Sequence, residues 1–292
     1  MVPARIGNYA AGHAPRVSVI LTVYKRTEYL QEALESVLAQ SYTDYEVVVA
    51  DDSGTAASSP IVSAYGSLPH LRYVANPATV GVSASLVGAV RLAQGQYIAI
   101  LNDDDAWESN LLAELVRPLL ADDNRVMAFS DHWVMDEAGR IDRTRTEESA
   151  SEAGRRALGA GVVPRSDEFC VKNGGFPVAT SAVFRRNAVD CSLVVPEVSG
   201  AYDYWISFLL AASGSSIYYI PNRLARYRIH PTMETLRRSH DKGENLVYIF
   251  ATMRKRGYFR EFDDVLRQKL SDALFAAGRD KLYFNRAKEA RT

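Results

Sequence analysis

The sequence predicts an α/β fold with a mostly parallel central sheet, helices on both faces of the sheet and a helical extension at the C-terminus. From Val17 onward, short β-branched runs alternate with segments whose apolar residues recur every three or four positions, the spacing of an amphipathic helix. Repeated βα units require right-handed crossovers, and these place neighbouring strands parallel. A length of 292 residues, with 47% hydrophobic and 24% charged residues, indicates one large domain with an extension.

Four strands and three helices are predicted in the first part of the chain. The run Val17–Val23 is largely β-branched, and the helix after it carries Leu30, Leu34 and Leu38 at helical spacing. In chain order we expect strands at 17–23, 45–50, 71–75 and 96–101, with helices at 28–39, 58–66 and 82–93 between them.

The second part is predicted to be less regular. We expect a strand and its return over 129–141, a mobile charged segment at 147–165, an apolar strand at 178–184, a helix at 204–212 and a strand at 222–229. Beyond residue 231, apolar spacing predicts helices at 244–255, 259–275 and 280–290. We expect these helices to cap the main domain, and the alternative is that they form the interface of a homodimer.

Composition narrows the classes of function. A formal net charge of -1 argues against general attraction to nucleic acid or anionic lipid. Cys170 and Cys191 are too few for a disulfide framework and lack metal-ligand spacing, so reduced thiols in a cytoplasmic protein are expected. Residues 1–16 lack the apolar centre of a signal peptide and are expected to form a flexible arm. Ser213–Ser216 interrupts the apolar stretch 205–220, so no transmembrane segment is expected.

Three consecutive carboxylates follow the fourth predicted strand, within the run Asn102–Trp107. Adjacent acids repel one another unless a cation lies among them. At the carboxyl end of a strand in an α/β sheet, where ligands bind, the fitting occupant is Mg²⁺ or Mn²⁺ holding the phosphates of a substrate. The alternative is a solvated acidic turn that caps the next helix.

The ends of the first two strands carry the residue types of a nucleotide site. Thr22, Tyr24 and Arg26 place a hydroxyl, an aromatic ring and a cation in one loop, and Asp52 follows the neighbouring strand. The ring can stack on a base, and a carboxylate can accept from a base N–H or a ribose hydroxyl. Glycine-rich phosphate loops are absent. Taken singly, each of these residues is more often a packing or turn residue.

Together these motifs resemble those of the inverting nucleotide-sugar glycosyltransferases of family 2, of the bacterial spore-coat polysaccharide type. The resemblance covers about residues 17–231 and rests on five motifs in the order of the family. They are VSVILTVY at 17–24, VADDS at 49–53, YIAILNDDD at 97–105, YDYW at 202–205 and YRIHP at 227–231. The resemblance implies a GT-A fold, Rossmann-like at its centre, and transfer of a sugar from a nucleotide diphosphate donor to an acceptor hydroxyl with inversion.

In the donor site, the resemblance implies that Thr22, Tyr24 and Arg26 contact the nucleotide and that Asp52 recognises the base. UDP and dTDP donors are favoured because their ring N–H can donate to Asp52, and a GDP donor is compatible. The chain departs from the family at Leu86-Val87, where an Arg-Asn pair is common, which puts one contact to sugar or phosphate in doubt.

For the chemistry, the resemblance implies a metal and a base. Asp103 stands at a ribose or metal contact, and Asp104 is the metal-binding carboxylate, with Asp105 as a second candidate. Asn102 replaces the first acid of the Asp-x-Asp triplet of many members. Asp203 stands at the catalytic base. Its alternative role is to cap the helix that follows it.

Further contacts are predicted from the later motifs. Arg228 and His230 are candidates for donor binding, with His230 on the diphosphate or the metal, and a packing role is the alternative for His230. Thr180, Ser181 and Trp205 are candidates for binding the acceptor, which would be a carbohydrate, a glycolipid or a small molecule.

These assignments divide the chain into the arm 1–16, a nucleotide-sugar-binding half 17–105, an acceptor-binding half 106–231 and the helical extension 232–292. Two other functions are weighed against glycosyl transfer. A nucleotidyltransferase usually has a glycine-rich loop after its first strand, and residues 22–27 contain no glycine. A non-catalytic nucleotide-sugar-binding module would be supported by loss of Asp104 or Asp203, and both are present.

Overall fold

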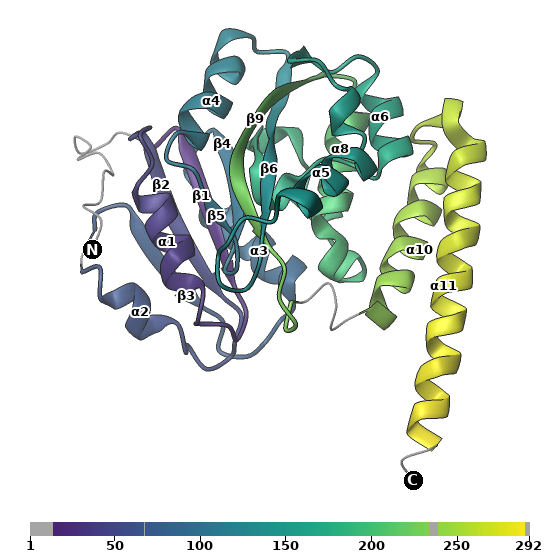
Figure 1. Ribbon diagram of the computed structural model, residues 1–292, viewed down its shortest axis with the longest axis horizontal. Helices are drawn as coiled ribbons and strands as arrows, with labels where there is room; N and C mark the ends of the chain where they lie inside the picture. Colours follow the sequence, from purple (N-terminus) through teal and green to yellow (C-terminus); the bar gives the residue numbers. More distant parts are fainter. Residues whose placement is uncertain (1–13, 67, 234–238, 290–292) are drawn as a thin grey trace.

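The computed structural model describes residues 14–66, 68–233 and 239–289. The strands among these residues form one nine-stranded sheet (Figure 1). Its strands follow the order β3-β2-β1-β4-β8-β6-β9-β5, and β7 pairs with β9. The strands of the described residues are β1 Val17–Val23, β2 Tyr45–Asp51, β3 Leu71–Ala75, β4 Tyr97–Asn102, β5 Ala106–Trp107, β6 Arg125–Met135, β7 Gly161–Val162, β8 Ala182–Arg185 and β9 Ser216–Arg228.

Helices cover both faces of this sheet, as predicted. Val19 and Leu21 of β1 pack with α1 and α4 on one face, whereas Ile20 packs with α3 and α8 on the other. A strand buried on both faces is largely apolar, and β1 is apolar at Val19, Ile20 and Leu21. The helices are α1 Leu30–Leu38, α2 Ser59–Ser63, α3 Val82–Leu92, α4 Leu111–Ala121, α5 Arg143–Glu152, α6 Ser166–Asn173, α7 Val178–Ser181, α8 Tyr202–Ala212, α10 Ser239–Arg256 and α11 Asp263–Glu289.

The sheet is parallel in its first part and mixed in its second. β1 pairs parallel with β2 and β4, and β2 pairs parallel with β3. β8 is antiparallel to both β4 and β6, whereas β6 and β9 are parallel. The regular βα alternation that predicts parallel pairing ends at β4, so the antiparallel insertion of β8 was not apparent from the sequence.

Two predicted segments differ from the structure. The apolar run at 178–184 is not one strand, because α7 occupies its first four residues and β8 begins at Ala182. The segment at 147–165 was expected to lack regular structure, and it does not. It contains the end of α5, a 3₁₀ turn and β7, and the Arg155 guanidinium of that turn lies 2.8 Å from the buried Asp131 carboxylate on β6.

The C-terminal part forms two helices, where three were predicted. α10 and α11 pack side by side at the right of Figure 1, and Ile249, Phe250 and Met253 of α10 join the core. α11 is continuous through Gly278, because a single glycine weakens a helix without ending it. The end of the third predicted helix, residue 290, and the first thirteen residues of the predicted arm lie outside the described residues.

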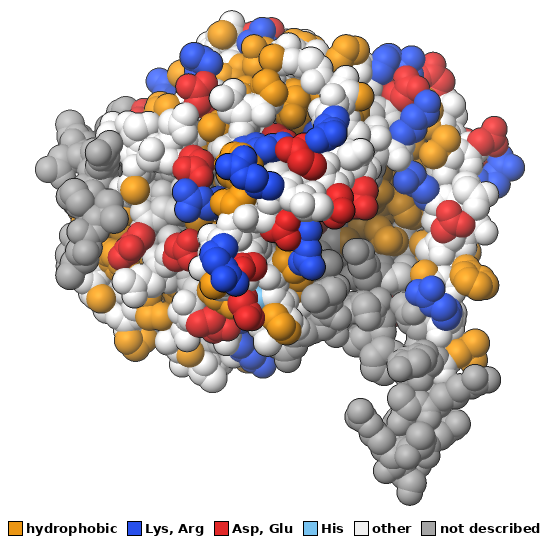
Figure 2. Space-filling view, viewed as in Figure 1, with side chains coloured by type: hydrophobic (Ala, Val, Ile, Leu, Met, Phe, Trp, Pro, Cys, Tyr) orange, Lys and Arg blue, Asp and Glu red, His pale blue; other side chains and the backbone are white. Residues whose placement is uncertain are grey.

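The surface carries no large area of a single charge in the view of Figure 2, where acidic and basic side chains are interspersed. Among the described residues, no helix is long and apolar enough to cross a membrane.

Candidate active site

The parallel register of β1, β2 and β4 brings the ends of these strands together at one edge of the sheet. Val23 lies opposite Asp51 on β2, and Thr22 lies opposite Asn102 on β4. The loop after β1, the acidic turn after β4 and Asp52 therefore meet, as expected for the carboxyl ends of parallel strands.

A pocket of about 180 Å³ lies at this edge. The strand ends form one wall, the loop 79–82 and the start of α3 form another, and α7, the start of α8 and the end of β9 complete it. Of the predicted site residues, eight line the pocket, namely Thr22, Tyr24, Arg26, Asp52, Asp103, Asp104, Thr180 and Asp203. Five are not among its lining residues, namely Asp105, Ser181, Trp205, Arg228 and His230.

Arg26 bridges the first two carboxylates of the acidic turn. Its guanidinium lies 2.6 Å from Asp103 Oδ1 and 2.9 Å from Asp104 Oδ2. Asp103 also accepts the backbone N–H of Tyr24 at 2.9 Å, which fixes the loop after β1 against the turn. Burial raises the pKa of Asp103, and Arg26 opposes that shift.

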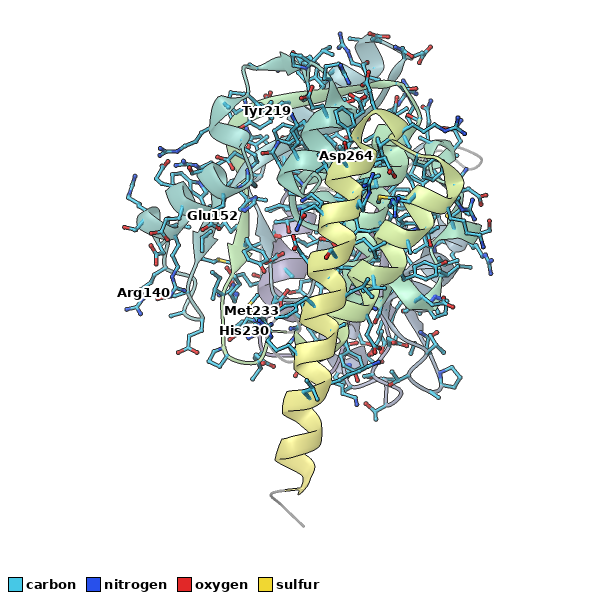
Figure 3. All side chains as sticks on the ribbon, turned by 90° about the vertical axis from the view of Figure 1, so that its right-hand side faces the viewer. Arg140, Glu152, Tyr219, His230, Met233 and Asp264 are labelled. Carbon is cyan, nitrogen blue, oxygen red and sulfur yellow. The ribbon has the colours of Figure 1, made fainter. Side chains whose placement is uncertain are left out.

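Asp104 is also held by His230, which lies 126 positions later in the chain. The Nε2 of His230 lies 3.1 Å from Asp104 Oδ2, and its Nδ1 lies 2.9 Å from Thr232 Oγ1. Figure 3 shows His230 next to Met233, which lines the pocket. His230 is buried, so in this structure it orients Asp104 and does not itself line the pocket.

Asp105 and Arg228 connect the acidic turn to β9. The Asp105 carboxylate accepts the backbone N–H of Arg228 at 2.9 Å and the hydroxyl of Thr180 at 3.2 Å. The buried Arg228 side chain donates to the carbonyl of Asp104 at 2.8 Å and pairs with Glu32. Because these groups are already satisfied within the protein, Asp105 and Arg228 stabilise the site from behind its lining.

Two aspartates at the end of β2, Asp51 and Asp52, have different roles. Asp51 is buried and accepts hydrogen bonds from Ser53, Ser58 and Tyr73, which fixes the start of α2. Asp52 lines the pocket, and its carboxylate accepts the backbone N–H groups of residues 80 and 81, each at 2.9 Å. Asp52 therefore shapes the loop that forms the second wall of the pocket.

Asp203 lies in the first turn of α8 and is partly exposed to the pocket. The residue that caps this helix is Ala201, so Asp203 is not the N-cap. One carboxylate oxygen accepts the backbone N–H of Tyr204 at 2.8 Å. A carboxylate in the first turn of a helix is also stabilised by the helix dipole.

Of the three predicted acceptor contacts, one lines the pocket and two do not. Thr180 lines the pocket. Ser181 donates to the carbonyl of Ser130 at 2.9 Å, and the indole N–H of Trp205 donates to the carbonyl of Leu193 at 2.7 Å. Both of the latter are buried and serve packing in this structure.

Tyr202 lines the pocket but was not predicted as a site residue. The Tyr202 hydroxyl donates to Asn102 Oδ1 at 3.0 Å, and Thr22 Oγ1 donates to the same oxygen at 2.9 Å. Asn102 thus connects β1, β4 and α8, although it replaces an acid of the motif. The adjacency of Tyr202 to Asp203 was the available signal, since both lie in the YDYW motif.

Asp104 is compatible with a divalent cation, but the protein alone supplies few ligands. Within residues 14–66, 68–233 and 239–289, no group of three or more His, Cys, Asp or Glu side chains is arranged to hold a metal ion. Mg²⁺ in such sites is typically held by one or two carboxylates, with substrate phosphates and water completing its shell. The residues present fit that arrangement.

Comparison with known proteins identifies the family. The sequence model of the family described as Glycosyl transferase family 2 matches residues 18–192, more than half of the chain. The chain belongs to glycosyl transferase family 2. This confirms the predicted family, while the spore-coat type stays a prediction. A glycosyltransferase of Rickettsia typhi, RT0329, whose name describes it as uncharacterized, is 25% identical over 226 residues, which are 76% of this chain and 67% of RT0329.

Solved structures share the fold of this family 2 member. Mannosyltransferase PcManGT from Pyrobaculum calidifontis, solved with GDP-Man and Mn²⁺, has a TM-score of 0.64 at 21% identity, covering 96% of this chain and 76% of PcManGT. TarS from S. aureus has a TM-score of 0.62 at 16% identity, covering 89% of this chain. The matched part is 43% of TarS, so this chain spans less than half of that protein. The likeness confirms the predicted GT-A fold.

Proposed function

We propose that this family 2 glycosyltransferase moves a sugar from a nucleotide diphosphate donor to an acceptor hydroxyl by a single displacement that inverts the anomeric carbon. The observation that carries the proposal is the pocket itself. It joins the strand ends that hold Asp52 and Asp104 to the first turn of α8, which presents Asp203. A donor site and the Asp203 carboxylate, the candidate proton acceptor, thereby lie in one cavity.

In this proposal the nucleotide binds against β1, β2 and the loop 79–82. Tyr24 and Asp52 contact the base and ribose, and Arg26 contacts phosphate. UDP and dTDP are favoured because Asp52 accepts hydrogen bonds, which suits a pyrimidine ring N–H, and GDP is compatible. PcManGT has been solved with GDP-Man and TarS with UDP-GlcNAc, so the shared fold accommodates both kinds of base.

The metal is proposed to be Mg²⁺ or Mn²⁺ held by Asp104. When bound there, such a cation neutralises the charge that develops on the leaving diphosphate. Asp105, Arg228 and His230 were predicted to contact the metal or the donor directly. In this proposal they instead support Asp104 and the turn that carries it. His230 orients the Asp104 carboxylate, and Asp105 with Arg228 fixes the turn that carries it.

Asp203 is proposed as the general base. The acceptor hydroxyl attacks the anomeric carbon while its proton passes to a carboxylate oxygen of Asp203, and the bond from the anomeric carbon to the diphosphate oxygen breaks. Thr180 is proposed to contact the acceptor, which is a carbohydrate, a glycolipid or a small molecule. Ser181 and Trp205 are not retained as contacts because both are buried and engaged with backbone carbonyls.

The experiment that tests this proposal has two stages. Thermal unfolding with UDP, dTDP or GDP, each with Mn²⁺, identifies the base, since a ligand that binds the native state raises its melting temperature. Transfer from the matching α-linked donor is then followed by proton NMR of the glycoside product. We expect a β-linked product, and an α-linked product would rule out single displacement.

We also propose that α11 forms the interface of a homodimer. Leu274, Phe275 and Leu282 are 55%, 75% and 64% exposed, and hydrophobic side chains are visible on the outer surface of this helix in Figure 2. An antiparallel pair of α11 helices about a two-fold axis would bury these side chains against their copies in the second chain.

A further inference from the structure

The guanidinium of Arg26 occupies the space between two carboxylates of the acidic turn. It lies 2.6 Å from Asp103 Oδ1 and 2.9 Å from Asp104 Oδ2. The exposed side-chain fractions of Arg26, Asp103 and Asp104 are 14%, 1% and 12%. Little water therefore screens these pairs, and the attraction between the charges is stronger than on an open surface.

This arrangement engages one of the two oxygens with which Asp104 could hold a cation. Asp104 Oδ2 is engaged by both Arg26 and His230. Asp105 offers no alternative ligand, since its oxygens accept from Arg228 and Thr180. A divalent cation at Asp104 and the guanidinium of Arg26 thus compete for the same negative charge.

A diphosphate changes this competition. Arginine binds phosphate oxygens through paired charged hydrogen bonds, as it binds a carboxylate. Arg26 lines the pocket in which the donor is proposed to bind, so a diphosphate there can take over the donors that Arg26 directs at Asp104.

We infer that Arg26 is a positioning residue that makes metal binding conditional on the diphosphate. Without nucleotide, it neutralises Asp103 and Asp104 and excludes the cation. With nucleotide, it moves to the phosphates and leaves Asp104 to the cation. Metal and nucleotide then strengthen each other's binding by the same factor, because such coupling is reciprocal. This inference rests on the proposed function, in which Asp104 holds the metal.

The test is the affinity of the full chain for Mn²⁺ alone, measured by electron paramagnetic resonance of the free ion. Arg26→Met removes the charge and keeps an unbranched side chain, and we expect it to bind Mn²⁺ roughly tenfold more tightly than the wild type. Arg140→Met is the control, because Arg140 pairs with Asp136 at an exposed position and we expect it to leave the affinity unchanged. Wild-type or weaker affinity in folded Arg26→Met would overturn the inference.

A second measurement separates competition from a general change of charge. The Mn²⁺ dissociation constant is measured with and without UDP, dTDP or GDP, corrected for metal bound by free nucleotide. We expect the nucleotide to tighten Mn²⁺ binding less in Arg26→Met than in the wild type, and equal tightening would overturn the inference. If Arg26→Met does not fold, Arg26→Lys replaces it, because lysine cannot span both carboxylates. A smaller gain in affinity is then expected, and no gain would overturn the inference.

The two proposals can fail separately. If no nucleoside diphosphate binds the wild type with Mn²⁺, the proposed function fails. If one binds, and Arg26→Met gains no affinity for Mn²⁺ alone, the inference about Arg26 fails while the function stands.

Discussion

Asp52 shows how one side chain serves both the fold and the pocket. Its carboxylate accepts from the backbone N–H groups of Val80 and Gly81 and from the Asn76 amide, each at 2.9 Å. Asp52→Asn replaces an oxygen with an NH₂ group that cannot accept. We expect weaker nucleoside diphosphate binding and a loss of about 1–3 kcal/mol in the free energy of unfolding. Calorimetric titration and urea unfolding measure the two effects. Full nucleotide affinity in the variant would show that Asp52 only forms the loop.

Asp203 allows chemistry to be separated from binding. In Asp203→Asn the amide oxygen can still accept the N–H of Tyr204, so the first turn of α8 is expected to persist. An amide is a poor proton acceptor, and turnover should fall by roughly two to four orders of magnitude. Nucleotide affinity and the melting temperature should stay at wild-type values. Steady-state transfer per folded molecule is the measurement. A retained rate would exclude Asp203 as the base, and the buried Asp131, paired with Arg155, could not replace it in this structure.

At the level of residues, the sequence predicted which side chains lie at strand ends better than it predicted which of them are buried. Thr22, Tyr24, Arg26 and Asp104 lie at or just after strand ends and line the pocket. Arg228 also lies at a strand end, yet its guanidinium turns toward Glu32 and backbone carbonyls. These partners are remote in sequence, so no local pattern could reveal them.

Among the elements, β6 carries a buried histidine that should make stability depend on pH. Burial, assisted by the nearby Arg155, lowers the pKa of His132 to about 3, and its Nδ1 has no hydrogen-bond partner in the described structure. The ring is neutral in the fold but is protonated below about pH 6.5 when the chain is unfolded. The contribution of the neutral His132 ring to the free energy of unfolding is therefore complete above about pH 6.5 and is lost as the pH falls toward 3.

Urea unfolding at pH 7 and pH 4.5 checks this expectation. The wild type should lose free energy of unfolding between the two values, and His132→Gln should lose less. His70→Gln, a change at a half-exposed histidine outside β6, serves as the control and should follow the wild type. An equal loss in His132→Gln and the wild type would contradict the account.

The elements that the sequence misassigned have separate physical causes. The run at 178–184 is apolar throughout, and a short buried run has no period that distinguishes a helix from a strand. Apolar spacing predicted a break between residues 275 and 280, but α11 packs against α10 and is continuous through Gly278, at the modest cost of one glycine in a helix. By contrast, β1 to β4 alternate with helices over a long span, and each of these elements was predicted.

For the whole molecule, the proposed dimer has a direct test. Phe275→Ser combined with Leu282→Ser should convert a wild-type dimer to a monomer, because the exposed apolar face of α11 is lost. Light scattering after size exclusion gives the mass. Leu120→Ser on α4, also at an exposed leucine, is the matched control and should stay dimeric. A monomeric wild type at all concentrations would contradict the proposal.

The overall architecture was predictable because the alternation of strands and helices is regular up to β4. Beyond β4 the order β8-β6-β9 depends on contacts between distant segments, such as β6 with β9. The same distant pairing brings His230 to Asp104 and α8 to the strand ends. The sequence therefore predicted the donor side of the pocket in more detail than the side that carries Asp203.

The central claim is that one pocket both binds a nucleotide sugar and transfers its sugar. The most direct measurement incubates the protein with UDP-, dTDP- or GDP-sugars, Mn²⁺ and pooled acceptors, and follows phosphorus products by ³¹P NMR. The account predicts release of a nucleoside diphosphate by the wild type and a near-complete loss in Asp203→Asn. Absence of that release, with formation of a nucleotide sugar and pyrophosphate in a parallel incubation that supplies a nucleoside triphosphate and a sugar phosphate, would contradict it, because that outcome identifies a nucleotidyltransferase.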